Sequence, residues 1–193
     1  MRAMKTLKNQ FVALAIFFAL AVSAANVGAS PLTESGQSFD QQQVSKRVRK
    51  ELVTLPYYGV FDNLAYEIEG RTVTLHGQVV RPSTRSDAAR RVAKIKGVEQ
   101  VINKIEVLPL SGFDDRIRAQ AYRNIFNTSS LYRYALGSNP SIRIVVNRGH
   151  LTLEGVVGTR MDKQLAEFAA REIPGVFSVT NNLRAESEER SRR

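Results

Sequence analysis

Residues 73–79 read VTLHGQV, and residues 151–157, 78 positions later, read LTLEGVV. The same spacing continues without a gap as far as Val107 and Ala185, and ten of these 35 aligned pairs are identical. A self-match of this kind indicates two tandem repeats of one structural unit. This pair of segments decides the fold, because both repeats must then have the same order of helices and strands.

Each repeat begins with an amphipathic helix, whose apolar residues recur at helical spacing. These residues are Val44, Val48, Leu52 and Leu55 in the first repeat and Ile117, Ala121 and Ile125 in the second. In each repeat two strands follow, in which apolar and polar residues alternate. The turn between them lies at residues 69–71 in the first repeat and at residues 147–149 in the second, which predicts a hairpin in each. A second helix and a last strand complete the repeat. Because a helix connects the last two strands, we expect them to be parallel.

The predicted fold class is therefore α+β, with two tandem αββαβ domains. Each domain is expected to have a three-stranded mixed sheet with two helices on one face. The domains span residues 42–108 and 115–185, after a linker at 30–41 and before a charged, disordered tail at 186–193.

Several polar and glycine positions recur in both repeats, and we interpret them as structural. Gly77 and Gly155 are expected to let the second helix approach its strand closely. Gly97 and Gly175 follow the end of that helix, where a left-handed residue ends a helix at little cost. The start of that helix is marked by Ser83 and Thr84 in one repeat and by Asp162 in the other. Asn103 and Asn181 are expected to be partly buried amides bonded to backbone.

The first 29 residues have the pattern of a signal peptide. Arg2, Lys5 and Lys8 precede an uncharged apolar run at residues 11–22, and small residues follow, so that cleavage is expected after Ala25 or Ala29. The apolar run is shorter than the ~20 residues that span a bilayer. Retention of this segment as an anchor is the alternative. Export to the periplasm is the expected localisation.

Charge and cysteine content restrict the function further. The chain has 28 Lys and Arg against 18 Asp and Glu, and without the three basic residues of the signal segment the balance is 25 − 18 = +7. A basic surface favours anionic partners. The sequence contains no cysteine, so it has no disulfide, no catalytic thiolate and no cysteine-ligated metal.

The two repeats resemble the BON domain (bacterial OsmY and nodulation). The resemblance rests on the hairpin segments quoted above together with GVEQVINKI at residues 97–105 and GVFSVTNNL at residues 175–183. It implies an exported envelope protein of Gram-negative-type bacteria that binds phospholipid or other envelope partners, without catalysis or a cofactor. The second repeat departs from the pattern at residues 126–140, which are longer and more aromatic.

Signatures of catalysis and of metal binding are missing from the sequence. His76 and His150 are not equivalent positions of the repeat, and the chain has no Gly-x-Ser-x-Gly elbow, Walker loop or Gly-x-Gly-x-x-Gly motif. Asp114 and Asp115 stand where acids favour a helix dipole. We therefore expect no enzyme, no cofactor, no metal and no small-molecule substrate, and the export signal argues against nucleic acid.

One stretch of the sequence is a candidate for a surface that binds a partner. Residues 122–134, YRNIFNTSSLYRY, alternate aromatic side chains with arginine, which suits the headgroup region of a membrane. The candidate binding residues are Tyr122, Arg123, Phe126, Leu131, Tyr132, Arg133 and Tyr134. The alternative interpretation is that they pack in the core and loops. The expected function is binding of anionic phospholipid, and the alternative is a protein-interaction, structural or osmotic-stress-protective module of the envelope.

Overall fold

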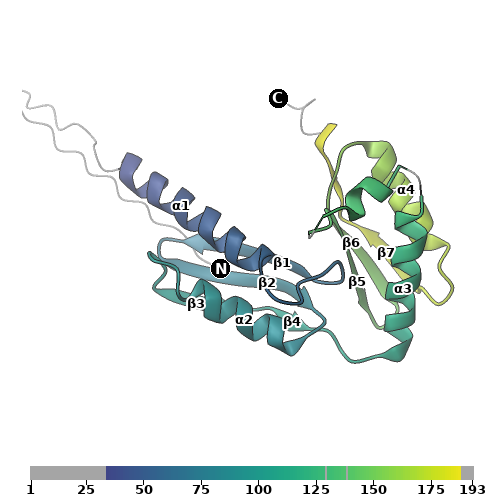
Figure 1. Ribbon diagram of the computed structural model, residues 1–193, viewed down its shortest axis with the longest axis horizontal. Helices are drawn as coiled ribbons and strands as arrows, with labels where there is room; N and C mark the ends of the chain where they lie inside the picture. Colours follow the sequence, from purple (N-terminus) through teal and green to yellow (C-terminus); the bar gives the residue numbers. More distant parts are fainter. Residues whose placement is uncertain (1–33, 129, 138, 188–193) are drawn as a thin grey trace, which may run out of the picture. The chain divides into compact units, whose positions relative to one another are not determined.

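The computed structural model describes residues 34–187, apart from 129 and 138. The predicted signal peptide and most of the predicted tail lie outside this range. Within it, each repeat forms one sheet with its own pair of helices (Figure 1).

The two repeats contain the same elements in the same order. The first repeat consists of α1 (Glu34–Val53), β1 (Asn63–Glu69), β2 (Thr72–Val79), α2 (Pro82–Val92), β3 (Gln100–Asn103) and β4 (Glu106–Val107). The second consists of α3 (Gly112–Phe126), the 3-10 helix η1 (Tyr132–Ala135), β5 (Ile142–Asn147), β6 (His150–Val157), α4 (Arg160–Arg171), β7 (Ser178–Asn181) and β8 (Arg184–Ala185). Helix α1 begins inside the stretch that the sequence assigned to a linker.

The sheets have the predicted mixed topology. Strand β1 is antiparallel to β2, while β3 and β4 both run parallel to β2. The second repeat pairs β5, β6, β7 and β8 in the same way. The α+β fold of two repeated units is thus confirmed. The last predicted strand is divided in two, because its pairing with β2 is interrupted after Asn103.

The repeated asparagines explain this interruption. Asn103 Nδ2 donates to Arg85 O of α2 at 3.1 Å, and its Oδ1 accepts from the backbone N–H of Ile105, also at 3.1 Å. Asn181 makes the equivalent bonds to Lys163 O and from the N–H of Leu183. Each asparagine therefore ties the last strand to the second helix and replaces ladder bonds at the break, as the sequence predicted for a backbone-bonded amide.

A separate hydrophobic core lies between the helices and the sheet of each repeat. In the first repeat α1, α2 and one face of β2 supply the core residues, among them Val48, Val92 and Leu75. In the second repeat the equivalent face of β6, which includes Leu153, packs against Ile117 of α3 and Ala170 of α4. Both helices of a repeat thus cover the same face of its sheet, as predicted.

Two sequence interpretations are corrected by the structure. Gly77 and Gly155 do not make room for a helix. A Cβ on Gly77 would lie 2.0 Å from the backbone oxygen of Asn63, the first residue of β1. A Cβ on Gly155 would lie 1.9 Å from the backbone oxygen of Ser141, the residue before β5. Their φ angles of 117° and 118° are open only to glycine. Each glycine therefore permits a local distortion of the hairpin ladder.

The starts of α2 and α4 also differ from the prediction. Helix α2 starts at Pro82 without a side-chain cap, and Thr84 is buried one turn inside it. Helix α4 is capped by Thr159, whose Oγ1 accepts from the N–H of Asp162. Asp162 is thus the third helical residue and binds the cap residue in return.

Candidate functional site

The aromatic and basic stretch at residues 122–134 forms the end of α3 and the connection that contains η1. Two of its residues lie in the hydrophobic core, since Phe126 is 3% exposed and Leu131 is fully buried. Ile125 occupies the core beside them. Burial removes Phe126 and Leu131 from any partner surface, and it matches the alternative interpretation for these two side chains.

Arg133 and Tyr134 bind a buried carboxylate. Tyr134 Oη donates to Asp162 Oδ2 at 2.8 Å, and Arg133 Nη2 reaches the same oxygen at 2.7 Å. Burial raises the pKa of Asp162, but hydrogen bonds from Thr159, Tyr134 and Arg133 outweigh burial, so that the pKa lies below its ordinary value. These contacts fix the start of α4 against η1, which gives Arg133 and Tyr134 a structural role.

A backbone N–H at the end of the hairpin is bound by a different side chain in each repeat. Gly158 N donates to Tyr134 Oη at 2.8 Å, and its equivalent 78 residues earlier, Val80 N, donates to Asp62 Oδ1 at 2.7 Å. Asp62 also accepts from Gly59 N at 2.9 Å. Burial raises the pKa of Asp62 above its ordinary value despite these bonds. The longer connection of the second repeat therefore supplies by a phenol what the first supplies by a carboxylate.

Four of the predicted residues are exposed at the surface: Tyr122, Arg123, Tyr132 and Arg133, the last of which binds Asp162 as described above. The Tyr122 ring packs edge-on against Phe126 at 5.0 Å and Phe61 at 6.5 Å between centroids. The Tyr122 ring therefore packs on one side against Phe126, which is a core residue.

A second aromatic cluster lies at the start of α3 and was missed by the sequence analysis. The rings of Phe113 and Phe177 are 5.9 Å apart between centroids, and they are 38% and 70% exposed. The Arg116 guanidinium lies 5.9 Å from the Phe113 ring, and His150 packs edge-on against Phe177. A Cβ at Gly149 would lie 2.7 Å from the Phe177 ring, and the φ of 78° at this turn also favours glycine.

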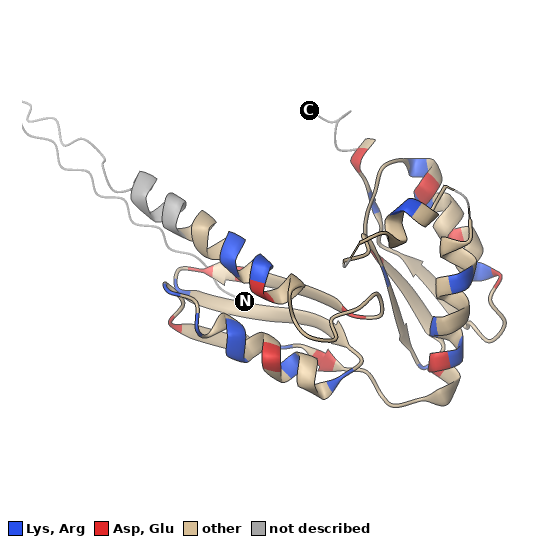
Figure 2. Ribbon diagram, viewed as in Figure 1, with Lys and Arg blue, Asp and Glu red and all other residues tan. Residues whose placement is uncertain are grey.

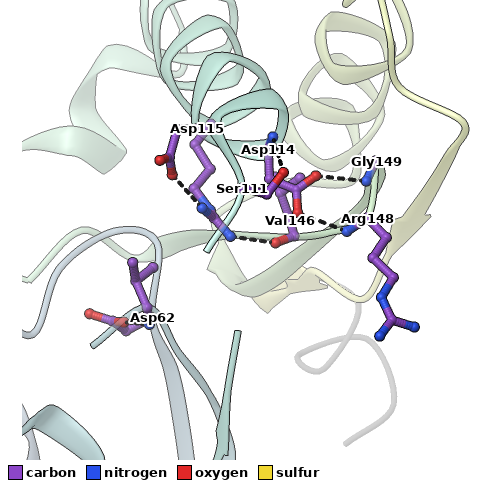
Figure 3. Close-up of polar contacts among 9 residues, drawn as sticks. Asp62, Ser111, Asp114, Asp115, Val146, Arg148 and Gly149 are labelled. Carbon is purple, nitrogen blue, oxygen red and sulfur yellow. Dashed lines mark hydrogen bonds and ion pairs between the residues drawn. The ribbon is translucent and has the colours of Figure 1, made fainter. Parts of the chain in front are cut away.

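The buried carboxylate of Asp114 binds the backbone of the β5–β6 turn next to this cluster (Figure 3). It accepts hydrogen bonds from the backbone N–H groups of Arg148 and Gly149, both at 2.8 Å. Its own N–H donates to Ser111, the cap of α3, at 3.1 Å. Arg148 has a φ of 51°, which few residues other than glycine adopt readily. Asp114 thus fixes the β5–β6 turn against the start of α3 and goes beyond the dipole role expected from sequence.

Further basic side chains lie on α3 and on the adjoining β5–β6 turn. Arg116 and Arg123 are exposed and seven residues apart, so they lie on one side of α3, and Phe113 is one turn before Arg116. Arg148 is exposed on the adjoining turn. Figure 2 shows the basic and acidic positions along the ribbon of α3. We call Phe113, Phe177, Arg116, Arg123 and Arg148 the α3 surface.

The sequence does contain a signal for this surface. Phe177 aligns with Glu99 at the repeat spacing, and Phe113 aligns with Asp40 when the first helices are superposed on their buried residues. Two acidic positions of the first repeat are thus aromatic in the second. A comparison of the exposed positions of the two repeats, in addition to their shared framework, would have found the pair.

The described residues offer little for chemistry of other kinds. Within residues 34–187 no group of three or more His, Cys, Asp and Glu side chains could hold a metal ion. A hollow of about 520 Å³ lies over the helix-free face of the second sheet, lined by polar side chains that include His150, Glu154 and Asn182. None of the helices described is long and apolar enough to cross a membrane.

A model of the BON domain matches the chain twice, at residues 40–109 and 114–187. The chain belongs to the BON domain family. The two matches cover both folded repeats described above, so this protein is a tandem two-BON protein. Membership supports association with the cell envelope, and the family is generally non-catalytic.

Solved structures from a secretion system are also similar. One is titled as the C-terminal domain of CdsD, the structural protein of the type III secretion system of Chlamydia trachomatis, with 12% identity and a TM-score of 0.30. The match covers 74% of this chain and 64% of that one, so the chain spans less than two thirds of its length. A second CdsD structure has 9% identity, a TM-score of 0.26 and coverage of 78% and 96%. No curated protein matches the chain.

Proposed function

We propose that this protein binds anionic phospholipid at a membrane surface of the cell envelope, through the α3 surface of its second BON domain, and that it catalyses no reaction. The observation that supports this most is the exposed pair of Phe113 and Phe177, with the Arg116 guanidinium against the Phe113 ring. Aromatic rings at the headgroup level and guanidinium groups paired with phosphate are the features of interfacial binding. Tyr122 and Tyr132 are the further candidates retained from the sequence.

The charge of the α3 surface is large enough to matter. Each basic residue close to an anionic membrane contributes roughly 1 kcal/mol. Arg116, Arg123 and Arg148 together therefore contribute about 3 kcal/mol, and insertion of the two rings adds a hydrophobic term of similar size. Either term alone gives weak binding, and we expect both to be required.

The location that suits this function is the periplasm. The proposal rests on the pattern of residues 1–29, with a basic start, a short apolar run and small residues before Ala25 or Ala29. In the periplasm the net charge of +7 on the remaining chain favours binding to anionic lipid.

Vesicle co-sedimentation of the chain without residues 1–29 tests this function. We expect recovery with vesicles that contain phosphatidylglycerol, little recovery with phosphatidylcholine vesicles, and release at high ionic strength. Phe177→Ala and Phe113→Ala together should weaken binding at least about ten-fold, because each ring loses most of its insertion energy. Phe168→Ala is the matched control, since Phe168 is 63% exposed on α4 and does not belong to the α3 surface.

The outcomes separate clearly. Equal recovery with neutral vesicles, or no recovery with anionic ones, contradicts lipid binding. If Phe168→Ala weakens binding as much as the double substitution, the protein binds lipid through another surface.

A further inference from the structure

The outer edge of the second sheet is already occupied. The N–H of Ile144 on β5 donates to Val60 O at 2.8 Å, which comes from the loop before β1. The carbonyl of Val146 accepts from Arg118 Nη2 at 2.7 Å, and Arg118 is held in place by Asp115 at 2.5 Å (Figure 3). The exposed edge that every terminal strand presents is thus closed by residues of this chain.

The equivalent edge of the first sheet belongs to β1. Tyr66 stands 78 residues before Ile144 and pairs with the same position of its neighbouring strand. Since the Ile144 N–H points away from the sheet, the backbone groups of Tyr66 also point outward. In an antiparallel ladder alternate residues share this orientation, so the backbone groups of Leu64 and Ile68 point outward as well.

Less covers this edge of the first sheet. Ser45 takes the place of Arg118 when the first helices are superposed on their buried residues, and its short side chain reaches only the Tyr66 hydroxyl. Gln41 Nε2 donates to Ile68 O at 3.2 Å from an exposed position. A hollow of about 440 Å³ remains beside the strand. It is lined by Gln41, Gln42, Ser45, Tyr66 and Ile68.

The backbone groups that stay free form a definite pattern. Burial raises the pKa of Tyr58, whereas the charge of Arg143 and a hydrogen bond with the Leu64 backbone lower it, which places the phenol beside the Leu64 N–H. Gln41 occupies the Ile68 carbonyl. Among the residues that the structure describes, no partner is found for the Leu64 carbonyl, the Ile68 N–H or either backbone group of Tyr66.

We propose that β1 pairs antiparallel with β1 of a second molecule of this protein, about a twofold axis at Tyr66. In this register Tyr66 faces Tyr66 of the second molecule, and the two exchange both backbone hydrogen bonds. Leu64 faces Ile68, and the free Ile68 N–H meets the free Leu64 carbonyl, twice by symmetry. Every free group on the edge thus finds a partner, while the two groups already bonded within the chain face one another.

The charges along β1 suit the same arrangement. Glu67 faces Ala65 of the second molecule, and Glu69 faces Asn63, so no two acids stand directly opposite. The side chains that line the hollow carry no charge. An isologous twofold contact closes on itself and gives a dimer instead of an open fibre. This proposal does not rest on lipid binding.

Register-specific crosslinking tests the pairing. The chain has no cysteine, and both Ala65 and Glu67 are exposed, so that Ala65→Cys and Glu67→Cys leave the core unchanged. A mixture of these two variants should form a disulfide dimer faster than either variant alone, because only residues 65 and 67 of different molecules are directly opposite. Gln100→Cys with Ile102→Cys is the matched control, since both side chains are exposed on β3 at the other edge of the same sheet.

Sedimentation equilibrium of the uncrosslinked chain without residues 1–29 provides a second measurement. Ala65→Glu places an acid directly opposite Glu67 of the second molecule, twice by symmetry, and should weaken dimerisation roughly ten-fold at low salt. Ala65→Lys should strengthen dimerisation. A monomer at all concentrations, or equal crosslinking by the β3 control mixture, overturns the proposal. Dimerisation that is insensitive to residue 65 overturns it as well, because the contact then lies elsewhere. A chain that dimerises without binding vesicles leaves the pairing intact and contradicts only the lipid proposal.

Discussion

Substitution of Gly77 by alanine should destabilise the first BON domain severely. A Cβ at this position would lie 2.0 Å from Asn63 O and 2.9 Å from Asn63 C. Both atoms belong to backbone that is paired with β2, so neither can move without opening the ladder. The φ of 117° is also unsuited to any residue with a Cβ.

The expected loss follows from these two effects. The backbone conformation costs about 1–3 kcal/mol for a residue other than glycine, and the displacement of a packed backbone costs about 1–3 kcal/mol more. A domain of this size has a free energy of unfolding of about 3–10 kcal/mol. Gly77→Ala should therefore remove roughly half of the stability of the first domain.

Gly70 provides a matched control in the same hairpin. Its φ of 57° lies in the left-handed region, but a Cβ there would meet nothing within 4 Å. Gly70→Ala should therefore cost only about 1–2 kcal/mol, the cost of the backbone conformation.

Urea unfolding followed by circular dichroism measures both variants, and heteronuclear NMR spectra show which domain is affected. We expect the signals of the second domain to persist in Gly77→Ala. If Gly77→Ala loses no more stability than Gly70→Ala, the close approach to Asn63 does not explain the glycine.

Three further predictions concern the buried carboxylates and their partners. Tyr134→Phe removes the hydroxyl shared by Gly158 N and Asp162, and it should lower the free energy of unfolding by about 1–3 kcal/mol, whereas Tyr132→Phe at the surface should change it by less than about 0.5 kcal/mol. The stabilisation from Asp162, whose folded pKa is lowered, is present above its unfolded pKa and is lost as the pH falls through the folded pKa, so Asp162→Asn should flatten the acid side of the stability profile. Asp62, whose folded pKa is raised, should stabilise the fold less as the pH rises through that pKa, and a shift of the same sign for Asp62→Asn and Asp162→Asn would contradict this account.

The repeat made most of the fold predictable. Two segments that share framework residues at one spacing must adopt the same topology, and periodicity within each element identifies its buried face. For this reason the parallel last strand and the backbone-bonded Asn103 and Asn181 were found correctly. The role of Gly77 was misjudged, because periodicity assigns a residue to a face but does not say which neighbour comes closest.

The candidate site was less accessible to sequence reasoning. The stretch at residues 122–134 is rich in aromatic and basic residues, but composition does not tell which of them face solvent. Phe126 and Leu131 are core residues, and Tyr134 is bound to Asp162, 28 positions away. Long-range partners of this kind depend on the path of a connection, which local periodicity does not encode.

The amino-acid sequence alone established two αββαβ domains, a basic net charge and the pattern of an exported chain. These properties follow from local periodicity, composition and the internal repeat. Only the tertiary structure brought Phe113 and Phe177 together across 64 positions of the chain. It also showed that Val60 pairs with the outer edge of the second sheet, while at the equivalent edge of the first sheet the Tyr66 backbone groups have no partner among the described residues. Such differences arise because equal backbones carry different side chains, and contacts between distant segments depend on both.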